Sequence, residues 1–152
     1  MTWAWEGLKE FDNAMIDWAN RSNAQARNAV GEAAHLVEGF AKASFGPAHA
    51  KGTPKTVFDR PQSITGDLRR SIQVMSIRSI GFGSWESRVA PQTPYGRRIE
   101  LGFMDMTDSL GRRFHQPAYP YMGVEGIRGG IPKALPVMPT VFFNAWSSAL
   151  PS

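Results

Sequence analysis

The chain has no proline before Pro47, and along this stretch apolar side chains recur every three or four residues. The recurring positions are Trp5, Leu8, Phe11, Met15 and Trp18, followed after an alanine-rich stretch by Val30, Ala33, Val37 and Phe40. This spacing puts the apolar side chains on one face of a helix. We therefore predict one long amphipathic helix over residues 3–45, with room for a single kink near Gly31. Gly46 and Pro47 are expected to end it, since glycine suits the left-handed position after a helix and proline cannot continue one.

The composition indicates one folded domain. With 152 residues and 42% hydrophobic residues, the chain has the size of a single domain and enough apolar side chains for a core. It has no cysteine, which excludes disulfides and thiolate metal sites. Charged residues in the first turns, from Glu6 to Asp12, argue against a secretory signal. No apolar run approaches the ~20 residues that span a bilayer, so we expect no membrane contact.

A small antiparallel sheet is predicted in the middle of the chain. A short helix over 66–70, with Thr65 as its N-cap, leads into a strand near 71–79, and a second strand follows near 84–90. The glycine-rich connection at 81–83 is too short for a crossover, so these strands should form a hairpin.

The second half alternates short elements with proline and glycine. Tyr95 to Leu101 is predicted to be a short helix, because Tyr95 and Ile99 share a face and Gly102 suits its C-terminal end. Residues 112–115 could form a third short strand, and residues 141–150 should close the chain as a helix.

Together these elements predict an α+β fold, in a single domain over residues 1–152. A long N-terminal helix packs on a small antiparallel sheet, with proline-rich loops and a short C-terminal helix. The extended loops lie at about 46–63 and 103–139. We expect both to be mobile in the free protein and to become ordered against neighbouring subunits, although simple mobile loops fit the first segment as well.

The sequence has no recognisable catalytic, cofactor-binding or metal-binding constellation. His35, His49 and His115 are far apart and lack the spacing of a paired metal site. The Gly81-Phe82-Gly83 string lacks the third glycine of a dinucleotide fingerprint and precedes a strand. We therefore expect no enzyme activity, no catalytic residues, no cofactor and no metal.

The net charge of +4 raises the question of nucleic-acid binding. The arginines form three pairs, Arg69-Arg70, Arg97-Arg98 and Arg112-Arg113, and none lies in a dense basic run or alternates with aromatic residues. Arginine is also enriched at protein–protein interfaces, and this use fits the isolated pairs better.

Three short motifs follow one another in fixed order. They read TGDLRRSI over 65–72, PYGRRIELG over 94–102 and QPAYPYM over 116–122. Together they resemble the HK97 gp10-like family of tailed-phage neck proteins, also described as tail-completion proteins. The matching positions are Thr65, Gly66, Leu68, Arg69, Ser71 and Ile72; Tyr95, Ile99, Glu100 and Gly102; and Pro117, Tyr119 and Pro120. The chain departs from the family pattern in two places. Phe103 stands where the family usually has threonine, and a glycine- and proline-rich stretch follows the third motif where the family usually has a short helix.

The resemblance implies a structural virion protein at the head–tail junction, assembled in the bacterial cytoplasm. It would be a ring subunit that joins head completion to the tail tube. The implied partners are further copies of the chain, with a ring of six as the expectation, and the neighbouring stopper, terminator or tail-tube proteins. Non-specific contact with exiting DNA is a further expectation. The alternatives are a tail terminator that caps the tube and a small basic DNA-binding protein.

The expected subunit interface combines arginines with the third motif. Its residues are Arg69, Arg70, Arg97, Pro117, Tyr119, Pro120 and Tyr121. The two tyrosines could instead close the end of the sheet. For Trp3, Trp5 and Trp18 we favour a packing stripe, with an oligomer interface as the alternative.

Overall fold

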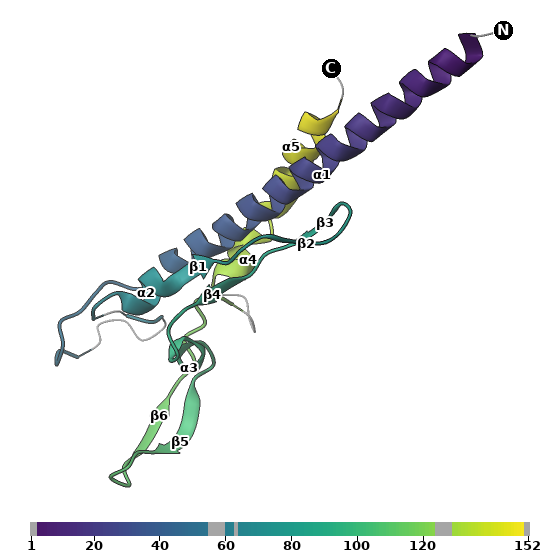
Figure 1. The fold of residues 1–152 in the computed structure, drawn as a ribbon. Helices are drawn as coiled ribbons and strands as arrows, with labels where there is room; N and C mark the ends of the chain where they lie inside the picture. Colours follow the sequence, from purple (N-terminus) through teal and green to yellow (C-terminus); the bar gives the residue numbers. More distant parts are fainter. Residues whose placement is uncertain (1–2, 55–59, 63, 124–128, 151–152) are drawn as a thin grey trace.

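The computed structural model describes residues 3–54, 60–62, 64–123 and 129–150, and the side chains from Gly7 onward. The fold is α+β, as predicted (Figure 1). The helices are α1 (Trp3–Ala43), α2 (Asp67–Ser71), α3 (Gly96–Leu101), α4 (Gly130–Ala134) and α5 (Met138–Ala149). The strands are β1 (Ile72–Val74), β2 (Arg78–Gly81), β3 (Ser84–Glu86), β4 (Val89–Pro91), β5 (Phe103–Thr107) and β6 (Arg113–Gln116).

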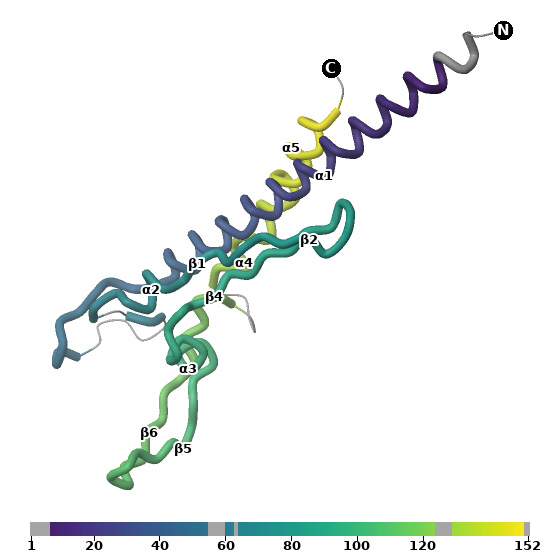
Figure 2. The backbone as a smooth tube through the Cα atoms, in the orientation of Figure 1, coloured from purple at the N-terminus to yellow at the C-terminus, as the bar shows by residue number. Residues whose placement is uncertain are grey.

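Helix α1 is the axis of the molecule, and the other elements cover only its C-terminal half. On that half Ala29, Ala33, Val37 and Ala41 are buried at a spacing of four residues. They pack under α4, α5 and β1. The C-terminal helix α5 lies alongside the middle of α1, and the first turns of α1 extend beyond it (Figures 1 and 2). Residues 7–17, which we call the α1 arm, are exposed throughout.

Two details of the predicted helix are wrong. The helix runs through Gly31 without a break. An added Cβ at Gly31 would lie 3.0 Å from Ile77 Cδ1, so this glycine gives the β-ribbon room against α1 instead of bending the helix. The helix ends at Ala43, and Gly46 has no positive φ. Its N–H donates to the carbonyl of Pro61 (2.9 Å), so Gly46 ties the end of the helix to the following loop.

The predicted hairpin is present as an interrupted two-stranded ribbon. Strands β1 and β4 pair antiparallel, with Ile72 opposite Pro91, and β2 pairs with β3, with Arg78 opposite Glu86. The Oδ1 atom of Asn23 accepts hydrogen bonds from the Gly83 N–H and from Trp85 Nε1, both at 2.9 Å. These bonds hold the ribbon tip against α1.

Residues 103–139 are not one extended loop, which corrects our prediction. Strand β6 was expected, but its antiparallel partner β5 was not. The pairing of β5 with β6 carries a register irregularity, and Asp105 has a φ of 52°, so the strand departs from regular extended geometry. The resulting β5–β6 hairpin projects from α3, away from α1 (Figure 1). Helix α4 also falls in this range. The described residues of 46–63 contain no helix or strand, as predicted.

The core lies where α1, α2, β1 and α4 meet. Its buried side chains are Val37, Ala41, Leu68, Ile72, Tyr121, Met122 and Ala134. Tyr121 and Ile72 are its largest fully buried members, and the Phe45 ring packs on Tyr121 with centroids 5.2 Å apart. Residues of the first and third sequence motifs therefore meet in one core.

Candidate functional site

Glu100, from the second motif, is buried and binds the backbone of the third. It lies on α3 and is 7% exposed. Its Oε2 atom accepts hydrogen bonds from the N–H groups of Tyr121 (2.8 Å) and Met122 (2.9 Å), and Oε1 accepts one from Gly123 (2.9 Å). Charge-assisted bonds of this kind are stronger than neutral ones, and they compensate the cost of burying a carboxylate. Glu100 therefore fixes the path of the chain through 121–123.

Tyr121 returns a bond to the second motif. Its hydroxyl donates to the carbonyl oxygen of Gly96, the first residue of α3, at 3.0 Å. Burial, together with the nearby negative charge of Glu100, raises the pKa of the Tyr121 phenol well above its ordinary value near 10. The neutral phenol is therefore the stable form in the folded chain.

Gly102 allows the two motifs to touch. Its φ is 67°, and an added Cβ would lie 2.6 Å from the Ala118 nitrogen and 2.7 Å from the Gln116 oxygen. Beside it, the Tyr119 N–H donates to the carbonyl of Ile99 at 2.9 Å. The glycine is thus required by backbone conformation and by lack of space.

The first motif starts α2 through Gly66 and not through Thr65. Gly66 is the N-cap residue, with a φ of 78° and no side-chain cap bond. Thr65 lies one residue before the N-cap; its hydroxyl donates to the Asp67 carboxylate and accepts from the Asp67 N–H at 3.4 Å, and that carboxylate also pairs with Arg70 at 2.6 Å. The predicted N-cap role of Thr65 is therefore wrong. Leu68, one turn further on, enters the core.

The structure divides the predicted interface residues into two groups. Tyr119 and Tyr121 are buried within this chain, so they close the structure internally and cannot serve as exposed anchors for a neighbour. This corrects our interpretation of both tyrosines. Pro120 is half-buried, whereas Pro117 and the arginines at 69, 70 and 97 are exposed. Among the described residues Arg69 and Arg97 form no ion pair, and Arg70 is paired with Asp67.

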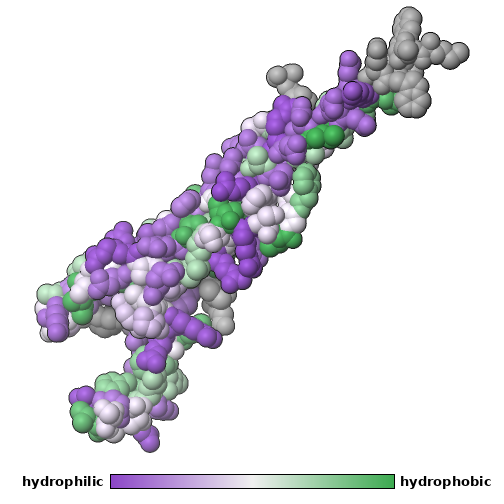
Figure 3. All heavy atoms as spheres, viewed as in Figure 1, coloured by the Kyte–Doolittle hydropathy of each residue, from purple (hydrophilic) through white to green (hydrophobic). Residues whose placement is uncertain are grey.

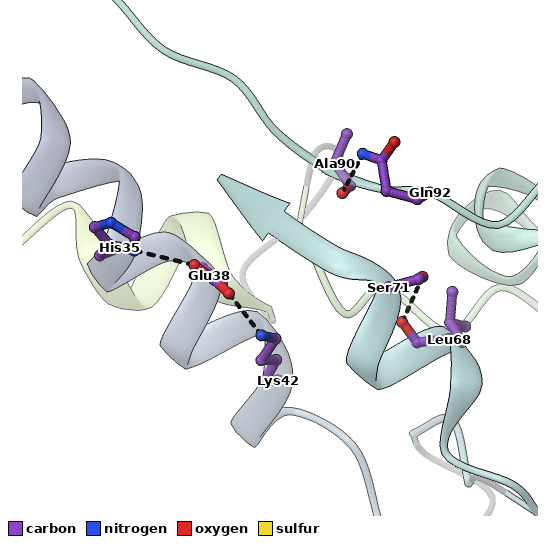
Figure 4. A network of polar contacts seen from close by, with 7 residues as sticks. All are labelled: His35, Glu38, Lys42, Leu68, Ser71, Ala90 and Gln92. Carbon is purple, nitrogen blue, oxygen red and sulfur yellow. Dashed lines mark hydrogen bonds and ion pairs between the residues drawn. The ribbon is translucent and has the colours of Figure 1, made fainter. Parts of the chain in front are cut away.

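Among the described residues, the histidines belong to no cluster of metal-ligating side chains. His35 Nδ1 lies 3.1 Å from Glu38, whose other oxygen is 2.5 Å from Lys42 Nζ (Figure 4). The Lys42 ammonium, with a smaller contribution from His35, holds the pKa of Glu38 below its ordinary value. In the same view the Ser71 hydroxyl donates to the Leu68 carbonyl, at the end of α2 (Figure 4). Within the part of the chain that the structure describes, no three metal-ligating side chains come together.

Among the exposed large apolar side chains of the described residues, two groups lie far apart. The α1 arm presents Leu8, Phe11, Met15 and Ile16, and the β5–β6 hairpin presents Met104, Met106, Leu110 and Phe114. Apolar atoms appear near the N-terminal end of α1 and at the free end of the hairpin (Figure 3). Sequence reasoning identified the arm stripe but assigned it to packing. It missed the hairpin surface, because the hairpin itself was not predicted.

An open groove continues the surface of the arm. It has a volume of about 420 Å³ and lies between α1, α5 and the β2–β3 turn. The large side chains that line it are Trp18, Phe82, Phe142 and Trp146. Trp18 therefore packs at an open edge, and the side chains of Trp3 and Trp5 lie outside the described part of the structure.

No family model, curated protein or solved structure matches the chain. In the described residues, no helix is both long and apolar enough to cross a membrane.

Proposed function

We propose that the chain is a structural subunit of the head–tail junction of a tailed bacteriophage. Copies form a closed ring, with six as the expected number, between the head-completion protein and the tail tube. Non-specific contact with the exiting DNA on the inner side of such a ring is part of the proposal.

One observation carries the proposal: buried residues from all three segments that resemble the neck-protein motifs meet in one cluster. Leu68 and Ile72 from the first motif lie in the core with Tyr121. Glu100 from the second binds the backbone of the third, and Gly102 gives that backbone room. Short strings that recur by chance have no reason to meet in space. Their convergence supports treating them as one family signature.

The shape of the subunit also supports a part in assembly. Two apolar surfaces, on the arm and on the hairpin, lie at opposite ends of the molecule (Figure 1). Large exposed apolar side chains that gather on one surface are typical of protein interaction sites. A tail terminator is an alternative within this class, since it is also a ring at the same junction.

A DNA-binding function has weaker support. Arg70 is paired with Asp67, and Arg112 with Asp108 at 2.7 Å, so part of the positive charge is taken up within the chain. A protein that binds phosphates loses affinity steeply as salt rises. Duplex binding with such a salt dependence, in a protein absent from virions, would favour this alternative.

The proposal is tested by locating the protein in particles. Antibody labelling and reconstruction of the phage that encodes the chain should place it at the junction, as a closed ring. Portal and tail-tube genes should flank its reading frame. A location at the tail tip, or a single copy in the neck, would contradict the proposal.

A further inference from the structure

We propose that the α1 arm of one copy binds the β5–β6 hairpin of the next copy. This contact would join neighbouring subunits of the ring, so the proposal rests on the proposed function. The occupant of each surface is thus a second copy of this chain.

The arm is a helix surface that the chain itself leaves uncovered. Leu8, Phe11 and Met15 recur every three or four residues and continue the apolar face of α1, but α5 covers only the middle of α1 and the first turns extend beyond it. Phe11 is 61% exposed. Since apolar side chains of this size gain most from being removed from water, a stripe over several turns favours a covering element.

The hairpin lacks a covering element as well. Met106 and Phe114 are cross-strand partners, so their side chains share one face of the ribbon. Leu110, at the tip, is 74% exposed. A two-stranded hairpin is marginally stable on its own and needs a third element on its apolar face. Among the described elements no helix or strand packs there (Figure 1).

The charges of the two surfaces are complementary. The arm has an excess of negative charge, because it contains one basic residue, Lys9, and three carboxylates, Glu10, Asp12 and Asp17. Asp12 lies one turn from both Leu8 and Ile16, at the edge of the apolar stripe. Complementary charges of this kind favour the correct partner and its orientation.

Across the hairpin and its base on α3, the exposed charges outside the Arg112–Asp108 ion pair are Arg97, Arg98 and Arg113 together with one carboxylate, Asp105, so positive charge is in excess. Arg112 lies 5.7 Å from the centroid of the Phe114 ring, so a guanidinium borders the apolar face, with its charge paired to Asp108 at 2.7 Å. Arg97 and Arg98 stand at the base of the hairpin, on α3, and both are exposed. Among the described residues neither has an ion pair.

The placement of the surfaces determines the kind of assembly. The arm and the hairpin lie at opposite ends of one subunit (Figures 1 and 2), so a single copy cannot join its own two surfaces. A contact between two different surfaces produces a ring when it repeats head-to-tail and the rotation closes, whereas two copies that make it reciprocally form a closed dimer. A symmetric dimer through one surface is therefore not expected.

Complementation between two variants tests the contact. The arm variant is Phe11→Ser/Met15→Ser and the hairpin variant is Leu110→Ser/Phe114→Ser. The controls are Asn13→Ser, on the opposite face of the arm, and His115→Ser, next to Phe114 on the other face of β6. All are full-length chains, and circular dichroism checks that each keeps its helix content.

We expect the wild type to self-associate in sedimentation velocity and native mass spectrometry, and both controls to behave like it. Each double variant alone should associate at least about tenfold more weakly. An equal mixture should form a one-to-one complex and nothing larger, because one intact arm then meets one intact hairpin. The inference is overturned if the wild type stays monomeric up to about 1 mM, if the double variants assemble normally, or if mixing restores no complex.

These outcomes are independent of where the protein acts. If complementation succeeds and particles carry no label at the junction, the proposed function fails and the contact stands. If label and ring are found but both double variants still form the ring, only the contact fails.

Discussion

The Glu100 carboxylate accepts a hydrogen bond from the Tyr121 N–H at 2.8 Å, across a sequence separation of 21 residues. Through this bond and those to Met122 and Gly123, one buried side chain joins two motifs that sequence alone shows only as separate strings.

Glu100→Gln should lower the free energy of unfolding by about 2–3 kcal/mol. The amide removes the charge that strengthens the backbone bonds and turns an N–H₂ group toward an N–H donor. Urea unfolding measures the change, with the exposed Glu32→Gln as the control. If both variants unfold at the same urea concentration, the carboxylate does not hold the cluster.

Tyr121→Phe should cost about 1–2 kcal/mol at pH 7, because the buried Gly96 carbonyl loses its donor. The wild type should also lose stability as the pH rises above about 10. There the unfolded phenol releases its proton, whereas the folded one, with its raised pKa, retains it. Unfolding curves between pH 8 and 11 should therefore converge for the two proteins, and a constant difference would contradict this.

Gly102→Ala should be much more harmful than Gly111→Ala. Both glycines have a positive φ, 67° and 75°, so each substitution carries a backbone cost of about 1–3 kcal/mol. At Gly111 an added Cβ meets nothing within 4 Å, whereas at Gly102 it meets backbone atoms at 2.6 Å. We expect the first variant to fold and the second to lose at least about 3 kcal/mol or remain unfolded, as read from thermal melts. Similar melting temperatures would show that the 117–118 backbone moves aside easily.

Leu68→Asp should unfold the protein, whereas Arg69→Ala should leave its stability within about 0.5 kcal/mol. The two residues are neighbours, but Leu68 is buried in the core and Arg69 is exposed. Gly66→Val should also be destabilising, because valine cannot readily adopt a φ of 78°. Thermal melts compare the three, and assembly assays then ask whether Arg69→Ala affects association alone. An unchanged melting temperature for Leu68→Asp would remove Leu68 from the core.

The β5–β6 hairpin and the loop at 46–63 should exchange their amide hydrogens faster in the free protein than in the assembled particle. Among the described elements no other helix or strand packs on the hairpin, and most of the described residues of 46–63 are exposed, so local opening should cost little. Hydrogen exchange of the two states makes the comparison, with the β1–β4 pair as an internal reference. Equal protection in both states would mean that these segments gain nothing from a neighbour.

The elements that the sequence predicted correctly depend on local pattern. The long helix follows from the apolar spacing between Leu8 and Phe40, and α3 from the Tyr95–Ile99 pair with Gly102 at its end. The ribbon of β1 to β4 follows from its short glycine turn. Each of these depends on residues close together in the chain, where periodicity and turn preference are informative.

Tertiary structure alone decided which surfaces face inward. Tyr119 and Tyr121 lie among prolines, and nothing near them in sequence shows that their hydrogen-bond partners are on α3, Ile99 for Tyr119 and Gly96 and Glu100 for Tyr121. The same holds for α1, whose apolar spacing is continuous although other elements cover only its C-terminal half. Strand β5 needed β6 to become a strand at all. Burial and pairing depend on residues far apart in the chain, so local periodicity determined the elements, and long-range packing determined which of their faces became core and which remained exposed.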